Sequence, residues 1–328
     1  MKDENLTDNY STMIINNEIM EECFENGKTE LYQSNSENIN PNDMMTDEPV
    51  QTINTTKFTT IQEEDVMPEV VPNPNPQLCE EYIPEIYEHL KDIEFDHLPS
   101  PNYMKSQTDI NEKMRGILID WLVEVHLKFK LLPETLFLTV NLIDRFLESK
   151  QIMRNRLQLV GVTAMLIACK YEEIYAPEVR DFVYITDKAY TKEEILAMEN
   201  EVLVTLDYNI TVPSVLKYLE VYTYYLKLDE MAVTLCRYLL ELLLVDYKML
   251  KFNPSLLASS AAYITMKIMK RDDCEKICQL SLYNEEKLRD CGQEILVVLD
   301  NVEKASLQAV RKKFSLPKYL EVARIKFN

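Results

Sequence analysis

One stretch of thirteen residues, Met114–His126, decides the fold: it reads MRGILIDWLVEVH and holds the only tryptophan of the chain. Met114, Leu118, Trp121 and Val125 recur in this stretch at the spacing of one side of an α-helix. Other apolar residues cover much of the remaining circumference. Such a helix is either wholly buried in a core or buried with one apolar face left for a partner.

The chain is acidic, but the acidity is confined to its first third. The full sequence has 328 residues and a net charge of −20. Residues 1–106 carry 5 Lys and 23 Asp or Glu, whereas residues 107–328 are nearly neutral, with 30 Lys or Arg and 32 Asp or Glu. A nearly neutral folded part argues against nucleic acid as a partner, because a basic patch would be expected there.

The composition also argues against an enzyme. The chain has 4 glycines, too few for a phosphate-binding loop, and 3 histidines. Its 7 cysteines are scattered, and Cys274 and Cys278 are expected to be free thiols of a reducing compartment. We therefore predict no cofactor and no metal site. The sequence has no apolar run of about 18 residues and no signal peptide, which predicts a soluble, intracellular protein with no membrane partner.

The pattern along the chain predicts four parts. Residues 1–77 lack apolar periodicity and end in a proline-rich linker, which is typical of a disordered acidic tail. Residues 78–94 form a short amphipathic helix expected to dock on the body. Two helical units follow, over residues 107–208 and 212–316, and a basic stretch lies near the C-terminus.

Sequence signals set the bounds of several helices in the first unit. Pro133 opens a predicted helix over 134–148, and a third helix follows over 155–173 with small residues at its centre. Pro177 is predicted to open a short fourth helix, and Pro213 the first element of the second unit. Thr191 and Glu194 fit a capping box that starts a helix ending near residue 206.

An internal repeat relates the two units. The segment EVLVTLD at 201–207 returns as EILVVLD at 294–300, and LVGVTAMLIACK at 159–170 has a counterpart in LLASSAAYITMK at 256–267. The repeat implies two five-helix units of roughly 100 residues each. No strand-like alternation bounded by glycine turns is present, so the fold class is predicted to be all-α.

Several long motifs of the first unit resemble the cyclin family, and within it the B-type, G2/mitotic-specific cyclins. Besides MRGILIDWLVEVH, they are NLIDRFL, LQLVGVTAMLIACKYEEIYAPEV, FVYITDKAYTKEEI and MENEVL. The resemblance implies two tandem five-helix cyclin folds with no catalytic residue. It also implies a 1:1 complex with a mitotic cyclin-dependent protein kinase, which the chain would activate at the G2/M transition in nucleus and cytoplasm.

The resemblance implies two binding surfaces and one ion pair. Arg115 and Asp144 match a family pair that joins the first two helices, and their apolar surroundings also favour a buried ion pair. The surface expected to bind the kinase comprises Lys170, Tyr171, Glu172, Glu199, Leu203, Leu206 and Tyr208, of which the two leucines are also compatible with ordinary core. The surface expected to dock substrates or inhibitors with Arg-x-Leu motifs comprises Met114, Ile117, Leu118, Trp121, Glu124, Leu157 and Gln158, for which a wholly buried first helix is the alternative.

The sequence departs from mitotic cyclins in its first third. Its first arginine is Arg115, so no Arg-x-x-Leu destruction box precedes the fold, and Lys2–Asn5 reads KDEN rather than the Lys-Glu-Asn degron. Cys291 lies near the position that Glu199 has in the first unit, so the second unit is expected to act as scaffold. Two alternatives stay open: a transcription-type cyclin partnering a polymerase-tail kinase, and a two-repeat cyclin-fold general transcription factor.

Overall fold

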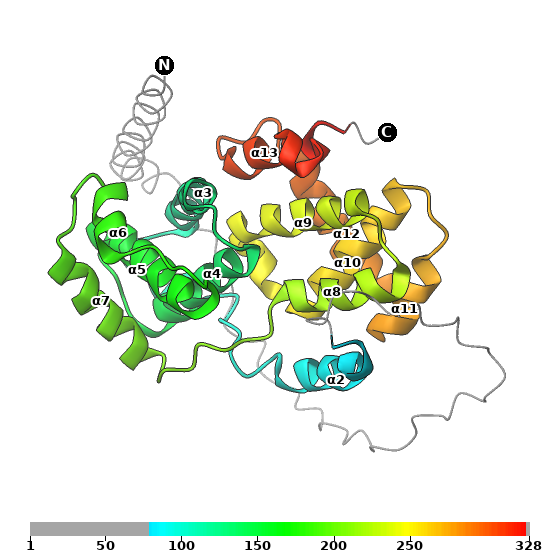
Figure 1. Ribbon diagram of the computed structural model, residues 1–328, viewed down its shortest axis with the longest axis horizontal. Helices are drawn as coiled ribbons and strands as arrows, with labels where there is room; N and C mark the ends of the chain where they lie inside the picture. The colour runs from blue at the N-terminus through cyan, green and yellow to red at the C-terminus, as the bar shows by residue number, and fades with distance from the viewer. Residues whose placement is uncertain (1–78, 326–328) are drawn as a thin grey trace, which may run out of the picture.

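The computed structural model describes residues 79–325, and these residues form helices and loops without a strand. The predicted all-α fold class is confirmed. The predicted acidic tail, residues 1–77, lies outside the described residues. Figure 1 shows two helical bundles side by side, with the C-terminal helix α13 lying across their junction.

Each bundle contains five α-helices. The first bundle consists of α3 (Glu112–Phe129), α4 (Pro133–Ser149), α5 (Arg154–Glu172), α6 (Val179–Ile185) and α7 (Lys192–Thr205). The second bundle consists of α8 (Val215–Leu226), α9 (Glu230–Val245), α10 (Pro254–Ile268), α11 (Cys274–Ser281) and α12 (Glu285–Asn301). Within residues 79–325, no helix is long and apolar enough to cross a membrane, and no group of three or more His, Cys, Asp or Glu side chains is placed to hold a metal ion.

The helix starts follow local chemistry. Pro133 is the first residue of α4, and the Thr191–Glu194 capping box opens α7, both as predicted. The predicted starts of two helices, at Pro177 and Pro213, were each two residues too early. Pro177 and Pro213 each precede a capping residue, since α6 and α8 start after Glu178 and Ser214, whose side chains accept hydrogen bonds from the first-turn N–H groups.

The centre of each bundle is a helix rich in small residues, α5 in the first and α10 in the second. Helix α5 contacts α3, α4, α6 and α7, and α10 contacts α8, α9, α11 and α12. At Gly161 of α5 the helices come so close that a Cβ atom would lie 2.7 Å from Leu118 Cδ1 of α3. The two matching segments of the sequence repeat therefore occupy equivalent central positions.

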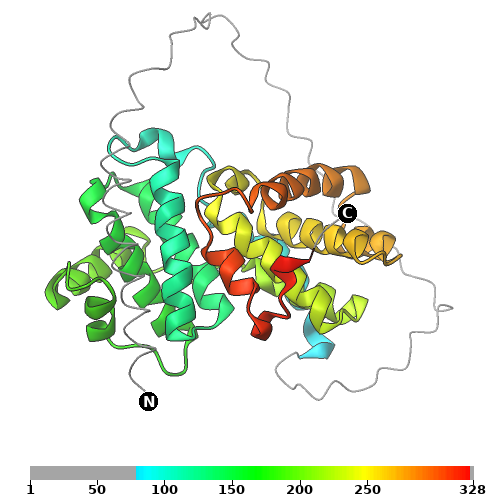
Figure 2. The ribbon, with the colours of Figure 1, turned by 90° about the horizontal axis from the view of Figure 1, so that it is seen from above.

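The two bundles are joined by the C-terminal segment. Helix α13 (Ala309–Phe314) contacts both α3 and α9 (Figure 2). Lys313, predicted only as part of a basic stretch, is fully buried in this junction, and its Nζ lies 2.7 Å from an oxygen of Glu241, which is also fully buried. The predicted basic stretch thus includes a charge that is paired inside the core.

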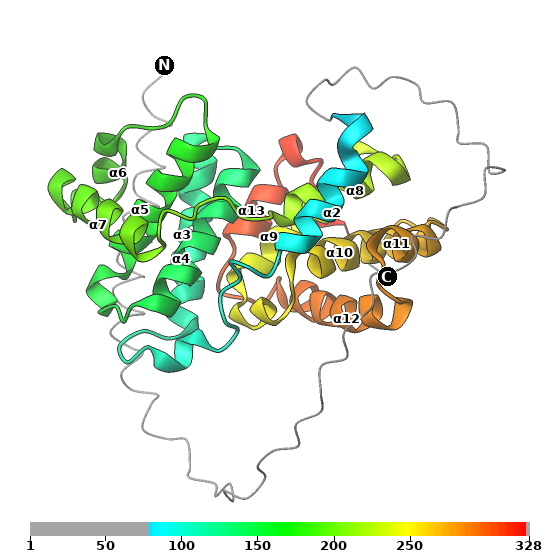
Figure 3. The same ribbon diagram turned by 90° about the horizontal axis from the view of Figure 1, so that it is seen from below.

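The described chain begins with a 3₁₀ turn over Glu80–Tyr82 and helix α2 (Ile83–Ile93). Figure 3 shows α2 alongside the second bundle, although it precedes the first bundle in sequence. Tyr218 of α8 donates a hydrogen bond from its hydroxyl to the Leu90 carbonyl (2.7 Å). The helix that the sequence predicts to dock on the body therefore docks on the second bundle.

Candidate functional site

An ion pair on the surface of the first bundle brings together two residues expected to meet a partner. Lys170 lies in the last turn of α5 and Glu199 in the middle of α7. The Lys170 Nζ donates to both carboxylate oxygens of Glu199, at 2.6 and 2.8 Å. The lysine side chain is 48% exposed. The Glu199 side chain is 14% exposed, so the pair lies at the edge of the surface, with its cation in solvent and its carboxylate half-buried. A pair open to solvent on one side adds little to stability, so Lys170 can leave Glu199 for a partner at small cost to the fold.

Two tyrosines flank this ion pair. Tyr171 is half exposed and its hydroxyl hydrogen-bonds with Thr211 Oγ1 in the linker between the bundles. Tyr208 is 63% exposed and, like Asp207 before it, has a positive φ angle. A left-handed conformation is costly for a residue other than glycine. Here it turns the chain sharply after α7, so that the Tyr208 ring is left in solvent.

The other three residues predicted for the kinase-binding surface are half-buried or buried. Glu172 and Leu203 are half-buried, and burial raises the pKa of the Glu172 carboxyl. Leu206 is buried in the hydrophobic core and offers no surface to a partner. That position is corrected to core, because Leu206 is the residue on which the end of α7 packs before the chain turns.

Two exposed apolar residues of this surface were missed from the sequence. Ile174 and Tyr175, in the loop after α5, are 89% and 92% exposed. The preceding Glu173 turns inward, where its Oε1 accepts from the Leu132 backbone N–H and the Thr135 hydroxyl. This contact fixes the base of the loop and leaves the apolar pair projecting. The sequence did contain a signal for this exposed pair, namely two consecutive apolar residues between the end of a helix and a proline. We call Lys170, Tyr171, Ile174, Tyr175, Glu199 and Tyr208 the α5–α7 surface.

Arg115 and Asp144, expected to pair, form a buried bidentate ion pair between α3 and α4. Arg115 Nε and Nη2 donate to the two Asp144 oxygens at 2.6 and 2.7 Å, and both side chains are 1% exposed. The Tyr103 hydroxyl donates to Asp144 Oδ1 (2.7 Å), and Arg115 Nη1 donates to the Leu244 carbonyl of α9 (3.0 Å). The pair therefore fixes the packing of the first bundle and also ties it to the second.

The residues expected to dock Arg-x-Leu motifs are mostly buried. Leu118 and Leu157 have no exposed surface, and Met114 and Trp121 are only 4% and 3% exposed. Leu118 and Leu157 are corrected to core residues, because Leu118 of α3 packs against Gly161 of α5 and Leu157 of α5 belongs to the buried hydrophobic core. Ile117 is 9% exposed and Glu124 and Gln158 are half-buried.

A groove of about 810 Å³ runs along α3 between the bundles. Ile117, Trp121 and Glu124 line it, together with residues of α9, α12 and the segment before α13. It also contains Asp120, which accepts a hydrogen bond from the Ala309 N–H at 2.9 Å. Burial raises the pKa of Asp120 to about 6. The groove thus combines apolar walls with acidic side chains.

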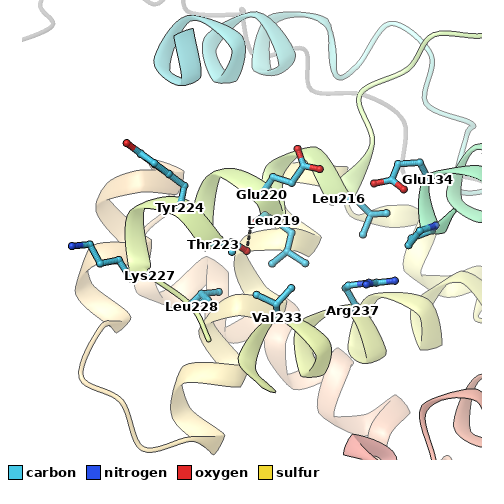
Figure 4. A pocket seen from close by; sticks show the side chains of 11 residues that line it. Glu134, Leu216, Leu219, Glu220, Thr223, Tyr224, Lys227, Leu228, Val233 and Arg237 are labelled. Carbon is cyan, nitrogen blue, oxygen red and sulfur yellow. Dashed lines mark hydrogen bonds between the residues drawn. The ribbon is translucent and has the colours of Figure 1, made fainter. Parts of the chain in front are cut away.

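A second cavity, of about 510 Å³, lies in the second bundle between α8 and α9 (Figure 4). Leu216, Leu219 and Val233 supply apolar walls. Its lining also includes the carboxylates of Glu134 and Glu220 and the cations of Lys227 and Arg237. The opposite charges offset each other, and the α5–α7 surface contributes no residue to this cavity.

Comparison with known proteins assigns the family. The family models for the cyclin N-terminal domain and the cyclin C-terminal domain match residues 85–211 and 213–328. The chain belongs to the cyclin family. Its fold resembles the crystal structure of a viral cyclin from herpesvirus saimiri, with a TM-score of 0.59 and 19% identity over 65% of this chain and 97% of that one.

Curated relatives narrow the similarity to B-type cyclins. The chain is 44% identical to the G2/mitotic-specific cyclin-B of Marthasterias glacialis over 76% of its own length. It is 46% identical to cyclin-B2-1 of Oryza sativa subsp. japonica over 75% of its length. The match covers 65% of the first relative and 59% of the second, so the similarity spans about two thirds of these proteins or less.

Proposed function

We propose that this chain is the regulatory subunit of a mitotic cyclin-dependent kinase, which it binds 1:1 and activates at the G2/M transition in nucleus and cytoplasm. The observation that carries the proposal is the α5–α7 surface, where an exposed ion pair lies among exposed aromatic and aliphatic side chains. Charged groups surrounded by large apolar residues are typical of the energetic centre of a protein interface.

The mechanism follows from what a protein kinase requires. Its strand lysine must pair with a glutamate on a movable helix before the phosphates and metal ions are correctly held. A partner that binds only the active position of that helix shifts the kinase toward activity. A change from 1:99 to 99:1 needs about 5.5 kcal/mol of differential binding. The cyclin supplies this binding energy and contributes no catalytic group.

Lys170 and Glu199 would supply the polar part of that binding energy. In the proposed complex they hydrogen-bond backbone groups at the start of the movable helix. Tyr171, Ile174 and Tyr208 exclude water around them. Charge-assisted hydrogen bonds in such a desolvated setting are roughly twice as strong as neutral ones. In the free chain the two groups pair with each other, with Lys170 48% exposed and Glu199 14% exposed, and both would change partners on binding.

The B-type relatives support the mitotic role over the alternatives. The two relatives described above are a G2/mitotic-specific cyclin-B and a cyclin-B2-1. Neither name indicates a transcription-type cyclin or a general transcription factor. The proposal for the timing of action, the G2/M transition, rests on this similarity and on the motifs of the first bundle.

The groove along α3 is a second candidate surface, for substrates or inhibitors with Arg-x-Leu motifs. Its side chains Asp120 and Glu124 suit a peptide cation, and Ile117 and Trp121 suit an apolar side chain. Because Leu118 and Leu157 are buried, the peptide would contact the rim formed by Ile117, Trp121 and Glu124. The docking proposal is independent of the activation proposal, since no residue of the α5–α7 surface lines this groove.

The test compares two ion pairs of the first bundle. Lys170→Ala and Glu199→Ala should each weaken binding to a purified mitotic cyclin-dependent kinase at least tenfold, because a lost charged hydrogen bond costs about 1.5–3 kcal/mol. The matched control is the surface pair Lys150–Glu201 (3.0 Å), whose glutamate lies two residues from Glu199 on α7. Lys150→Ala and Glu201→Ala should bind normally. Equal losses from both pairs, or none from either, would show that the interface lies elsewhere.

A further inference from the structure

Helix α2 ends in a buried carboxylate that reaches the second bundle. Glu94, the residue after α2, is 1% exposed. Its Oε2 accepts from the Ser255 backbone N–H (3.2 Å), and its Oε1 accepts from the Ser255 hydroxyl (3.1 Å) and the Asn253 amide (2.8 Å). Lys91 Nζ, one turn earlier in α2, lies 3.1 Å from the same oxygen. Four donors therefore converge on one carboxylate.

The Glu94 carboxylate caps the N-terminus of another helix, α10. Asn253 precedes α10 but makes no side-chain cap hydrogen bond to it. The first N–H groups of a helix need acceptors, and the helix dipole favours a negative charge there. Glu94 supplies both from a position 161 residues earlier in the chain. The Tyr283 hydroxyl closes the network, since it lies 3.0 Å from Lys91 Nζ and 2.8 Å from Ser255 Oγ.

The rest of α2 is held more loosely. Its other polar contacts with the second bundle are the Leu90 carbonyl with Tyr218 and the Tyr87 hydroxyl, 3.2 Å from that of Tyr222. An isolated helix of 11 residues is not stable in water. Apolar packing of the buried Ile83 holds the start of α2, and among these polar contacts the Glu94 network, at the other end, contains the buried charge.

The position of α2 matters because one face of it adjoins the α5–α7 surface. Tyr82 and Ile86 are 56% and 41% exposed. Ile86 and Leu90 line a cavity of about 720 Å³ between the bundles, and Tyr171 and Thr211 line the same cavity. Ile86 of α2 therefore lies on the same cavity as Tyr171, a member of the α5–α7 surface.

We propose that Glu94 is a positioning residue that fixes α2 on the N-terminus of α10 and so holds Tyr82 and Ile86 in place as an extension of the α5–α7 surface. The expected consequence of this anchoring, tighter kinase binding, rests on the proposed function. The anchoring of α2 by Glu94 can be tested without the kinase.

The first measurement is amide hydrogen exchange on the full chain without a partner. In Glu94→Ala, the amides of α2 should exchange at least tenfold faster, while those of α8, α5 and α10 beyond its first turn keep their protection; the Ser255 amide, which loses its acceptor, should also exchange faster. Glu94→Gln should fall between the wild type and Glu94→Ala, because its side-chain oxygen can still accept from Lys91, Asn253 and the Ser255 hydroxyl, whereas its NH₂ group would face the Ser255 N–H and the negative charge is lost. The matched control is Glu88→Ala, which removes an exposed carboxylate of the same helix. Unchanged exchange in α2, or faster exchange throughout the second bundle, would overturn the assignment.

The second measurement is affinity for a purified mitotic cyclin-dependent kinase in a double-mutant cycle. Glu94→Ala and Ile86→Ala should each weaken binding several-fold, and the double variant should bind about as weakly as Glu94→Ala alone. Such non-additivity is expected when one residue acts through the placement of the other. Losses that multiply would show that Glu94 acts independently of α2. A wild-type chain that fails to bind the kinase would refute the proposed function, whereas the exchange result would still decide the anchoring role of Glu94.

Discussion

The buried pair Lys313–Glu241 allows a prediction about stability. Lys313 Nζ lies 2.9 and 2.7 Å from the two Glu241 oxygens, and neither side chain is exposed. Lys313→Met would keep most of the side-chain volume and leave the carboxylate buried without its cation. Breaking one side of a buried pair costs about 3–5 kcal/mol. For two bundles that unfold together, at about 2–4 °C per kcal/mol, the melting temperature should fall by about 6–20 °C.

The same network includes a neutral histidine. Burial lowers the pKa of His126 to about 3, and the nearby Lys313 charge acts in the same direction. At pH 7 the ring is therefore neutral. Its Nδ1 accepts from Lys313 Nζ (3.5 Å) and its Nε2 donates to the Leu132 carbonyl (2.9 Å). In Lys313→Met the pKa of His126 should rise, which proton NMR of the imidazole would detect.

The assay is thermal unfolding followed by circular dichroism, with two companion variants. Lys312→Met removes the neighbouring lysine of α13, which is 66% exposed and 3.9 Å from Glu124, and should change the melting temperature by no more than a few degrees. Lys313→Met combined with Glu241→Leu should recover most of the loss, because an apolar pair of similar volume can replace a buried ion pair. A single variant that melts within about 2 °C of the wild type would refute the reasoning.

Three further predictions follow from the same contacts. Arg115→Ala should lower stability by about 3–5 kcal/mol in denaturant titration, because Asp144 stays buried without its partner. The pKa of Asp120 is raised to about 6, so the folded chain binds a proton at this carboxyl more tightly than the unfolded chain does. The contribution of Asp120 to stability is therefore full at low pH and is lost as the pH rises through 6. Asp120→Asn should flatten the pH dependence of the melting temperature between about pH 4 and 7. Glu124→Ala should weaken an Arg-x-Leu peptide several-fold in fluorescence anisotropy without lowering the melting temperature, whereas Leu118→Ala should cost about 3–5 kcal/mol of stability because it empties core space.

The amino-acid sequence by itself determined the all-α fold, the capping box at Thr191 and the existence of two related bundles. Each of these features rests on local periodicity or on residues within one turn of each other, and such patterns survive whatever the rest of the chain does. Resemblance to cyclins assigned Lys170 and Glu199 to one surface, and the structure shows that they pair there, with Nζ 2.6 Å from the carboxylate. The partner that uses this surface stays a prediction.

Only the tertiary structure decided which side chains are accessible. Leu118 lies on a helix whose apolar residues cover most of the circumference, so periodicity could not tell the core face from a face left for a partner. Leu206 follows the last residue of α7, where the helical period ends, and the packing of the chain after α7 decides that it is buried. Ile174 and Tyr175, by contrast, lie in a loop where no helical period applies, and both are exposed.

The structure alone also decided the long-range electrostatics. Lys313 is one of three consecutive basic residues and would be solvated in an isolated helix, yet it meets Glu241 from 72 positions earlier. Glu94 meets Ser255 across 161 positions. Burying either charge is favourable only if the complementary group is already in place. Because that group can lie at any distance along the chain, no local sequence pattern records it, and the packing of α13 and α2 on the second bundle is what brings the charges together.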